Sequence, residues 1–133
     1  MDLKKMTTYT FLIAGAFIMF NFLSGFIGQG NSMSPQQFME ARVNTPGVLI
    51  DVRTPGEFKA GHLKGTDFNF DLISGEFQRK VTALDKNETY YLYCRSGNRS
   101  GQAARMMRSA GFENVYNIGG FQSLVRAGLE PNK

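Results

Sequence analysis

Short apolar runs alternate along most of the chain with stretches in which apolar residues recur at helical spacing. Residues 48–52 (Val-Leu-Ile-Asp-Val) and 89–93 (Thr-Tyr-Tyr-Leu-Tyr) are mostly apolar or aromatic and too short for helices, so they predict buried strands. Weaker runs predict short strands at 68–72 and 115–118. The pattern therefore predicts strands that are separated by helices.

Two of the helices are predicted from their start signals. The segments 34–37 (Ser-Pro-Gln-Gln) and 54–57 (Thr-Pro-Gly-Glu) each combine a capping hydroxyl, a proline at the first helical position and a Gln or Glu three residues after the cap. They predict short helices that end near Arg42 and near Gly61. Further helices are predicted over 76–84, from 97–100 to about 111, and from 119–120 to about 127.

This order of elements predicts an α/β fold, with a parallel sheet that carries helices on both faces. In the longest helix we expect Met106 and Met107 to pack in the core. Ligands of such sheets bind beyond the carboxyl ends of the strands. Cys94 follows the predicted strand 89–93 directly, so it is expected at that place.

Residues 1–30 differ in composition from the rest of the chain. Lys4 and Lys5 precede an apolar stretch over 11–27, and the stretch counted over 7–28 just reaches the length of about 20 residues that a spanning helix needs. A buried or amphipathic helix is disfavoured because residues 11–20 have no polar face. We predict a signal peptide or membrane anchor at 1–30 and one folded domain at 31–133.

The two lysines before the apolar stretch predict that the domain is exported, to lie in the periplasm or to be anchored to the inner membrane. Both cleavage and retention of residues 1–30 are open. The best small-x-small cleavage site, Gly28-Gln29-Gly30, is weak, which slightly favours an uncleaved anchor and membrane association through residues 1–30.

Composition excludes several classes of function. The chain of 133 residues carries 15 Lys and Arg against 11 Asp and Glu, and this net charge of +4 is too small and too scattered to indicate a nucleic-acid partner. Its 42% hydrophobic residues suffice for a packed core. One Cys and one His exclude an intramolecular disulfide and any multi-cysteine metal site, so we expect no metal and no cofactor.

The residues after Cys94 form the candidate site. A strand there runs into a polar loop that opens a helix, and the free backbone N–H groups, the helix dipole and two guanidinium groups favour an anion over a neutral thiol. We therefore expect the pKa of Cys94 to lie below its free value of about 8.5, which makes the thiol a nucleophile. The alternative, a buried structural cysteine, is disfavoured by the polar loop. The loop consists of Arg95, Ser96, Gly97, Asn98, Arg99 and Ser100.

The motif CRSGNRS, with IDVRTPGEF and AGHLKG before it and GFENVYNIGGF after it, resembles the single-domain rhodaneses over about residues 34–131. The resemblance implies a rhodanese-like fold and a sulfurtransferase in which Cys94 takes sulfane sulfur from thiosulfate or a similar small anionic donor. The sulfur then passes from a Cys94 persulfide to a thiol or cyanide acceptor. By the same resemblance, the donor-binding residues are Arg95, Ser96, Gly97, Asn98 and Arg99, and the two arginines stabilise the sulfite leaving group.

Several residues near the same sheet edge are expected to support the site. Asp51 and Arg53 end the first strand and could pair with one another or with the loop. Glu57 is expected to close the capping box with Thr54 rather than to act on the substrate. His62 is expected to make structural hydrogen bonds rather than to act as a base.

The loop length and the cysteine count disfavour two other classes of enzyme. Phosphatases of similar fold use Cys-x5-Arg, whereas this chain has Cys-x4-Arg ending at Arg99, and an arsenate reductase would need a second cysteine. A sulfur-relay or partner-binding module with little turnover of its own is the remaining alternative. The chain departs from the family pattern at Lys64, where proline is frequent, and at Leu124, where tryptophan is frequent, which puts local packing in doubt.

Overall fold

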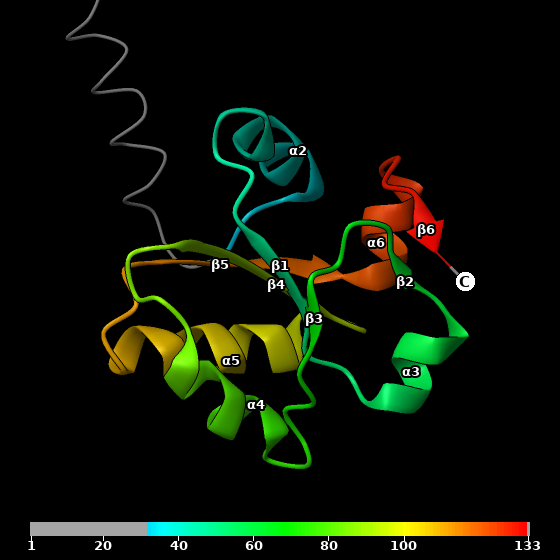
Figure 1. The fold of residues 1–133 in the computed structure, drawn as a ribbon. Helices are drawn as coiled ribbons and strands as arrows, with labels where there is room; N and C mark the ends of the chain where they lie inside the picture. Colours follow the sequence, from blue (N-terminus) through cyan, green and yellow to red (C-terminus); the bar gives the residue numbers. More distant parts are fainter. Residues whose placement is uncertain (1–31, 133) are drawn as a thin grey trace, which may run out of the picture. The chain divides into compact units, whose positions relative to one another are not determined.

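Four parallel strands form the central sheet in the order β3-β1-β4-β5 (Figure 1). The computed structural model describes residues 32–132, and the segment predicted as a signal or anchor at 1–30 lies outside them. The strands are β1 (Val48–Asp51), β3 (Phe68–Asn69), β4 (Thr89–Cys94) and β5 (Asn114–Gly120).

Helices cover both faces of this sheet, as Figure 1 shows: α4 and α5 lie on one side of it and α2 and α6 on the other. The α/β fold with a parallel sheet is thus confirmed. Two short strands, β2 (His62–Leu63) and β6 (Pro131–Asn132), pair antiparallel beside it. The helices are α2 (Pro35–Asn44), α3 (Pro55–Ala60), α4 (Glu76–Lys80) with a 3₁₀ turn over Val81–Ala83, α5 (Asn98–Ser109) and α6 (Phe121–Arg126).

Both predicted capping boxes are present. The backbone N–H of Gln37 donates to Ser34 Oγ, and the N–H of Ser34 donates to the Gln37 side chain at 2.8 Å. At α3 the same exchange joins Thr54 and Glu57. Because each box satisfies N–H groups that have no partner within the helix, the sequence marks these helix starts locally.

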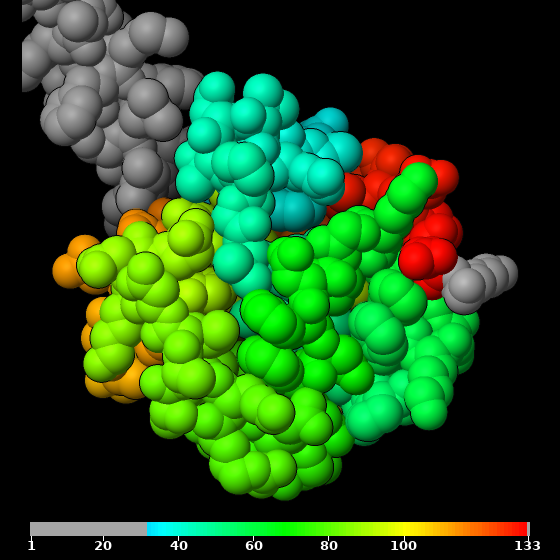
Figure 2. Space-filling model, in the orientation of Figure 1, coloured from blue at the N-terminus to red at the C-terminus, as the bar shows by residue number. Residues whose placement is uncertain are grey.

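The two faces of the sheet form two separate cores. Along β4, Tyr90, Leu92 and Cys94 pack toward α4 and α5, whereas Tyr91 and Tyr93 pack toward α2 and α6. All five side chains are buried because helices cover both faces. Strand β3 is an edge strand of the sheet, and Figure 2 shows the segment around it, in green, on the outside of the molecule below α2, in cyan.

Burial raises the pKa of the tyrosines in these cores. For Tyr93 burial, together with the nearby Asp51 carboxylate, raises the pKa to about 12. Burial likewise raises the pKa of Tyr90, Tyr91 and Tyr116. The Tyr93 hydroxyl is held by the N–H of Leu63 at 3.0 Å, so its desolvation is partly compensated.

Two expectations about the elements are wrong in part. The strand predicted at 68–72 extends only over Phe68–Asn69, because the Asp71 carboxylate accepts the N–H of Ile73 at 2.9 Å and turns the chain. Met107 is buried as expected, but Met106 is 39% exposed. Met107 follows the buried Ala104 and Ala103 by three and four residues and so continues their buried face, whereas Met106 is rotated from Met107 by about 100°. Within residues 32–132, no helix has the length and apolar character needed to cross a membrane.

Candidate functional site

Cys94 is the last residue of β4 and lies at the carboxyl end of the sheet, where α5 begins four residues later at Asn98. Its side chain is fully buried. Between strand and helix the chain turns through Gly97, whose φ of +94° lies in the left-handed region that favours glycine. The loop predicted from the sequence is thus wrapped around the sulfur atom.

Two groups hydrogen-bond the Cys94 sulfur. The backbone N–H of Gly97 donates to Sγ at 3.0 Å, and the Ser100 hydroxyl lies 3.3 Å from Sγ. Burial alone would raise the pKa of Cys94, but the Ser100 hydroxyl and the N–H groups of Ser100, Ser96 and Gly97 outweigh it, so the pKa is lowered. The predicted direction is confirmed, although the Ser100 hydroxyl was not among the predicted causes.

Strand β5 forms the wall against which this loop packs. The side chain of Asn117 donates from Nδ2 to the carbonyl of Gly97 at 2.9 Å, and its Oδ1 accepts from the Ser100 hydroxyl at 2.7 Å. A methyl group on Gly120 would lie 2.6 Å from the carbonyl oxygen of Arg95. Only glycine therefore allows the loop and β5 to approach this closely.

Arg99 is paired with Glu57 rather than turned toward open solvent. Nη1 and Nη2 of Arg99 donate to the two carboxylate oxygens of Glu57 at 2.8 and 2.9 Å. The hydrogen bond from Arg99 is the largest cause that lowers the pKa of Glu57, to about 2. Glu57 thus closes the capping box as expected, and it also joins α3 to the first turn of α5, which the sequence did not indicate.

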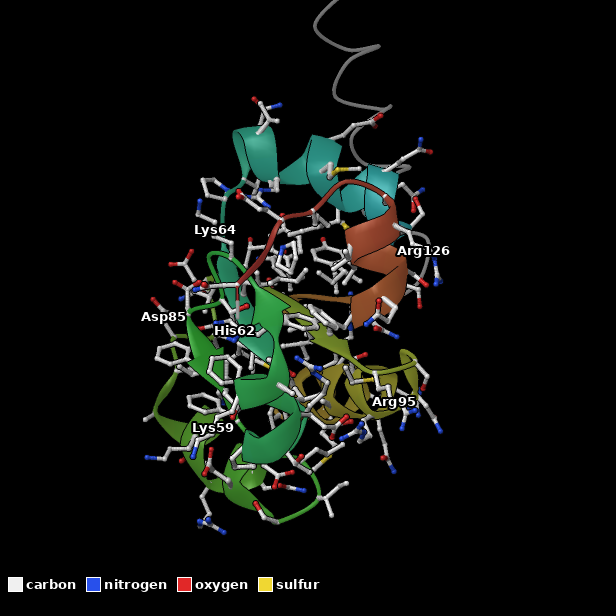
Figure 3. The ribbon with its side chains drawn as sticks, turned by 90° about the vertical axis from the view of Figure 1, so that its right-hand side faces the viewer. Lys59, His62, Lys64, Asp85, Arg95 and Arg126 are labelled. Carbon is white, nitrogen blue, oxygen red and sulfur yellow. The ribbon has the colours of Figure 1, made fainter. Side chains whose placement is uncertain are left out.

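Arg95 is exposed and lines a cavity of about 370 Å³ beside the loop. Figure 3 looks onto this end of the sheet and places Arg95 and Lys59 on opposite sides of α3 in the view. Ser96 and Asn98 are also exposed. The other residues that line the cavity are Arg53, Glu57, Ala60, Gly61, Phe121 and Gln122.

Asp51 and Arg53 pair with one another, one of the two arrangements expected from the sequence. Arg53 Nη2 lies 2.7 Å from Asp51 Oδ2, and both side chains are buried. The same Nη2 donates to the carbonyl of Gly61 at 2.7 Å, and the guanidinium lies over the ring of Phe121 at 4.6 Å. The pair therefore connects the end of β1 to the end of α3 and to Phe121, which lines the cavity.

The remaining singled-out residues have local structural contacts. The ring of His62 stacks on Phe58 with a centroid distance of 3.7 Å, and its Nδ1 lies 3.0 Å from the Phe58 carbonyl, which fits the expected structural role. Lys64 forms an exposed ion pair with Glu130 at 3.3 Å. Leu124 lies on α6 and is fully buried in the core on that side of the sheet.

The site contains three contacts that sequence reasoning missed: the Ser100 hydroxyl on the sulfur, the Asn117 amide on the loop, and the pairing of Glu57 with Arg99. Ser100 belongs to the motif CRSGNRS and follows the cysteine by six residues, so its hydroxyl was a local signal. The other two contacts join residues 20 and 42 positions apart, and no local pattern reports them. Among residues 32–132, no cluster of three or more His, Cys, Asp or Glu side chains could hold a metal ion.

A cysteine with a lowered pKa, in a loop between a strand and a helix at the carboxyl edge of a parallel sheet, is an arrangement of α/β proteins that can stabilise a thiolate. The Rhodanese-like domain family matches residues 34–127. The chain belongs to this family.

Comparison with individual proteins supports the same assignment. The chain is 34% identical over 95 residues to the thiosulfate sulfurtransferase GlpE of Ectopseudomonas mendocina, covering 71% of this chain and 84% of that protein. It is 33% identical over 76 residues to the thiosulfate sulfurtransferase PspE of Escherichia coli, covering 57% and 72%. A rhodanese-related protein of Thermoplasma volcanium superposes with a TM-score of 0.65 at 26% identity, covering 77% of this chain and 98% of that one.

Other curated relatives are longer than the matched region. The match spans 57% of an uncharacterized Bacillus subtilis protein, YqhL, and 54% of an uncharacterized Synechocystis protein. It spans 36% of the putative sulfur carrier protein YrkF of Bacillus subtilis. The chain therefore matches only part of the length of these relatives.

Proposed function

We propose that this protein is a sulfurtransferase that moves sulfane sulfur from thiosulfate, or a similar small anionic donor, to a thiol or cyanide acceptor. The observation that carries the proposal is the Cys94 sulfur, held by the Gly97 N–H at 3.0 Å and the Ser100 hydroxyl at 3.3 Å. Both donors stabilise a thiolate, which is the reactive form in sulfur transfer. The relatives named thiosulfate sulfurtransferases support the choice of donor.

The reaction proceeds in two displacements. The Cys94 thiolate attacks the outer sulfur of thiosulfate, the sulfur–sulfur bond of the donor breaks, and sulfite leaves with the bonding electron pair. The acceptor thiolate or cyanide then attacks the outer sulfur of the Cys94 persulfide, and the Cys94 thiolate leaves. The products are a persulfide of the acceptor or thiocyanate, and the enzyme returns to its starting state.

The cavity beside the loop supplies the binding groups for this chemistry. Arg95 is exposed and lines this cavity, and the Gly97 N–H of the same loop donates to the Cys94 sulfur. An anionic donor would gain charge-assisted hydrogen bonds there, each worth about 1.5–3 kcal/mol. Arg99 can contribute once the donor competes with Glu57 for its guanidinium.

Mass spectrometry of the purified full chain tests the proposal. After incubation with thiosulfate, the protein should gain the mass of one sulfur atom, and cyanide should remove that mass and yield thiocyanate. Cys94→Ser should fold normally, gain no sulfur and form no thiocyanate, because Cys94 is the only cysteine of the chain. Sulfur transfer near the wild-type rate in Cys94→Ser would contradict the mechanism.

A sulfur-relay module is the second candidate function, and the relative named as a putative sulfur carrier protein favours it. Such a module would take up one sulfur on Cys94 but turn over slowly with small acceptors. Steady-state thiocyanate formation separates the two candidates. Many turnovers per Cys94 support the enzyme, and a single rapid turnover supports the relay.

For residues 1–30 we propose export of the domain, with the segment acting as a signal peptide or as an inner-membrane anchor. The proposal rests on the two lysines before the apolar stretch. It places the domain in the periplasm, where the acceptor would have to be found.

A further inference from the structure

The side chain of Asn117 packs against the cysteine loop and makes three hydrogen bonds, two to residues of the loop and one to Gly119 on its own strand. Nδ2 donates to the Gly97 carbonyl at 2.9 Å, and Oδ1 accepts from the Ser100 hydroxyl at 2.7 Å and from the Gly119 N–H at 3.0 Å. Gly97 and Ser100 are the two residues whose donors reach the Cys94 sulfur. One amide therefore holds both of them.

Asn117 is itself firmly placed on β5. Its neighbours Tyr116 and Ile118 pack on the α2 and α6 side of the sheet, so Asn117 faces the α5 side, where the loop lies. A register shift of β5 against β4 follows at this point, which is a common way to direct a side chain at an active site. The Asn117 carbonyl also accepts the N–H of Met33 at 2.8 Å, so the backbone is held on its outer side.

We propose that Asn117 is a positioning residue that holds Gly97 in the orientation in which its N–H donates to the Cys94 sulfur. This inference rests on the proposed use of Cys94 as a nucleophile. Gly97 has a φ of +94°, and glycine has the widest conformational freedom of any residue. A hydrogen bond to its carbonyl therefore restricts a turn that would otherwise be free to move. Anchoring its carbonyl keeps the loop turn, and with it the N–H on the sulfur, in one conformation.

The Ser100 hydroxyl has a single proton, and its oxygen lies between Asn117 Oδ1 and Cys94 Sγ. Asn117 could therefore act in the opposite sense, by drawing this proton away from the sulfur. We favour the positioning role because Asn117 also holds Gly97, which is the nearer of the two donors to the sulfur. The two roles predict opposite changes in the pKa of Cys94.

The test is the pH dependence of Cys94 alkylation by iodoacetamide in the full chain. Cys94 is the only thiol, so the reaction reports on no other group. The midpoint of the profile measures the pKa, and the plateau at high pH measures access to the sulfur. Alkylation needs no sulfur donor, so its result stands even if the protein proves inactive as a sulfurtransferase.

In Asn117→Ala the midpoint of the alkylation profile should move to higher pH. The alkylation rate at neutral pH, divided by the rate on the high-pH plateau, should therefore fall about three- to tenfold. Ser100→Ala should also raise the midpoint, because it removes one of the two donors to the sulfur. In the Ser100→Ala background, Asn117→Ala should still raise the midpoint, because it acts there through Gly97 alone. Asn114→Ala, on the same strand but at its far end, should leave the midpoint unchanged.

An unchanged midpoint in folded Asn117→Ala would overturn the proposal. A lower midpoint would also overturn it, and would show that Asn117 competes with the sulfur for the Ser100 proton. Circular dichroism establishes whether each variant is folded. If Asn117→Ala is unfolded, the same criteria apply to Asn117→Ser, which keeps a small polar side chain at the position.

Discussion

Replacing Glu57 by glutamine should increase the catalytic efficiency of the protein with thiosulfate. In the free protein the Glu57 carboxylate occupies the guanidinium of Arg99 through two hydrogen bonds of 2.8 and 2.9 Å. An anionic donor that uses Arg99 must displace this carboxylate or share the guanidinium with it. Glutamine has nearly the same size and keeps an acceptor oxygen for the cap of α3, but it removes the competing charge.

The magnitude follows from the exchange of one kind of hydrogen bond for another. A bond to a charged group contributes roughly 1.5–3 kcal/mol, and a neutral one roughly 0.5–1.5 kcal/mol. The Arg99 and Glu57 side chains are 21% and 27% exposed, so solvent screening places the difference near its lower end, at about 1 kcal/mol. Because about 1.4 kcal/mol corresponds to a factor of ten, kcat/KM should rise about three- to tenfold.

The assay is thiocyanate formation from thiosulfate and cyanide by the full-length protein. Glu130→Gln is the matched control, because it removes a carboxylate from the exposed ion pair with Lys64. This control should leave kcat/KM unchanged. An unchanged or lower kcat/KM in folded Glu57→Gln would refute the reasoning, and would mean that Arg99 serves to hold α3 rather than the donor.

Three further predictions concern packing, acid stability and location. Gly120→Ala should lower the melting temperature of the domain and slow sulfur transfer, because the added methyl group would lie 2.6 Å from the Arg95 carbonyl oxygen. Gly56→Ala is the control and should do neither, because no atom lies within 4 Å of its added methyl group. Equal melting temperatures of the two variants would contradict this prediction. The pKa of Glu57 is lowered from 4.5 to about 2 in the folded state, so its stabilisation is present above 4.5 and lost as the pH falls toward 2. In urea titrations, the free energy of unfolding of wild type should therefore fall by ~1–2 kcal/mol more over this pH range than that of Glu57→Gln. Identical falls in the two proteins would contradict the role of Glu57 in acid stability. A tagged full chain should fractionate with the periplasm or with washed membranes, and recovery in the cytosol would exclude export by residues 1–30.

The parts of the fold that the sequence predicted are those encoded by neighbouring residues. Each capping box, at Ser34 and at Thr54, is formed by residues within a span of four positions. The run over 89–93 is apolar at nearly every position, which is typical of a strand that is covered on both faces. Cys94 and its loop follow such a strand directly, so the place of the site could be inferred from element order alone.

The contacts that were not predicted depend on the sheet topology. Glu57 meets Arg99, and Asn117 meets Gly97, only because β1, β4 and β5 lie side by side with their carboxyl ends at one edge. Gly120 was expected only as the start of the last helix, yet the backbone of the cysteine loop occupies the space that a side chain at this position would need. Such close approaches are set by the distance between strands, and composition carries no trace of that distance.

The raised pKa values of the buried tyrosines have an optical consequence for Cys94. A thiolate absorbs ultraviolet light more strongly than a thiol, but tyrosinate absorbs in the same region and usually obscures it. The pKa values of Tyr90, Tyr91, Tyr93 and Tyr116 are raised, whereas the pKa of Cys94 is lowered. The chain also has no tryptophan and no second cysteine, and its fifth tyrosine is Tyr9. With Tyr9 replaced by phenylalanine, the absorbance of the unlabelled protein should therefore follow the ionisation of a single sulfur atom, and its loss on adding thiosulfate would record persulfide formation in real time.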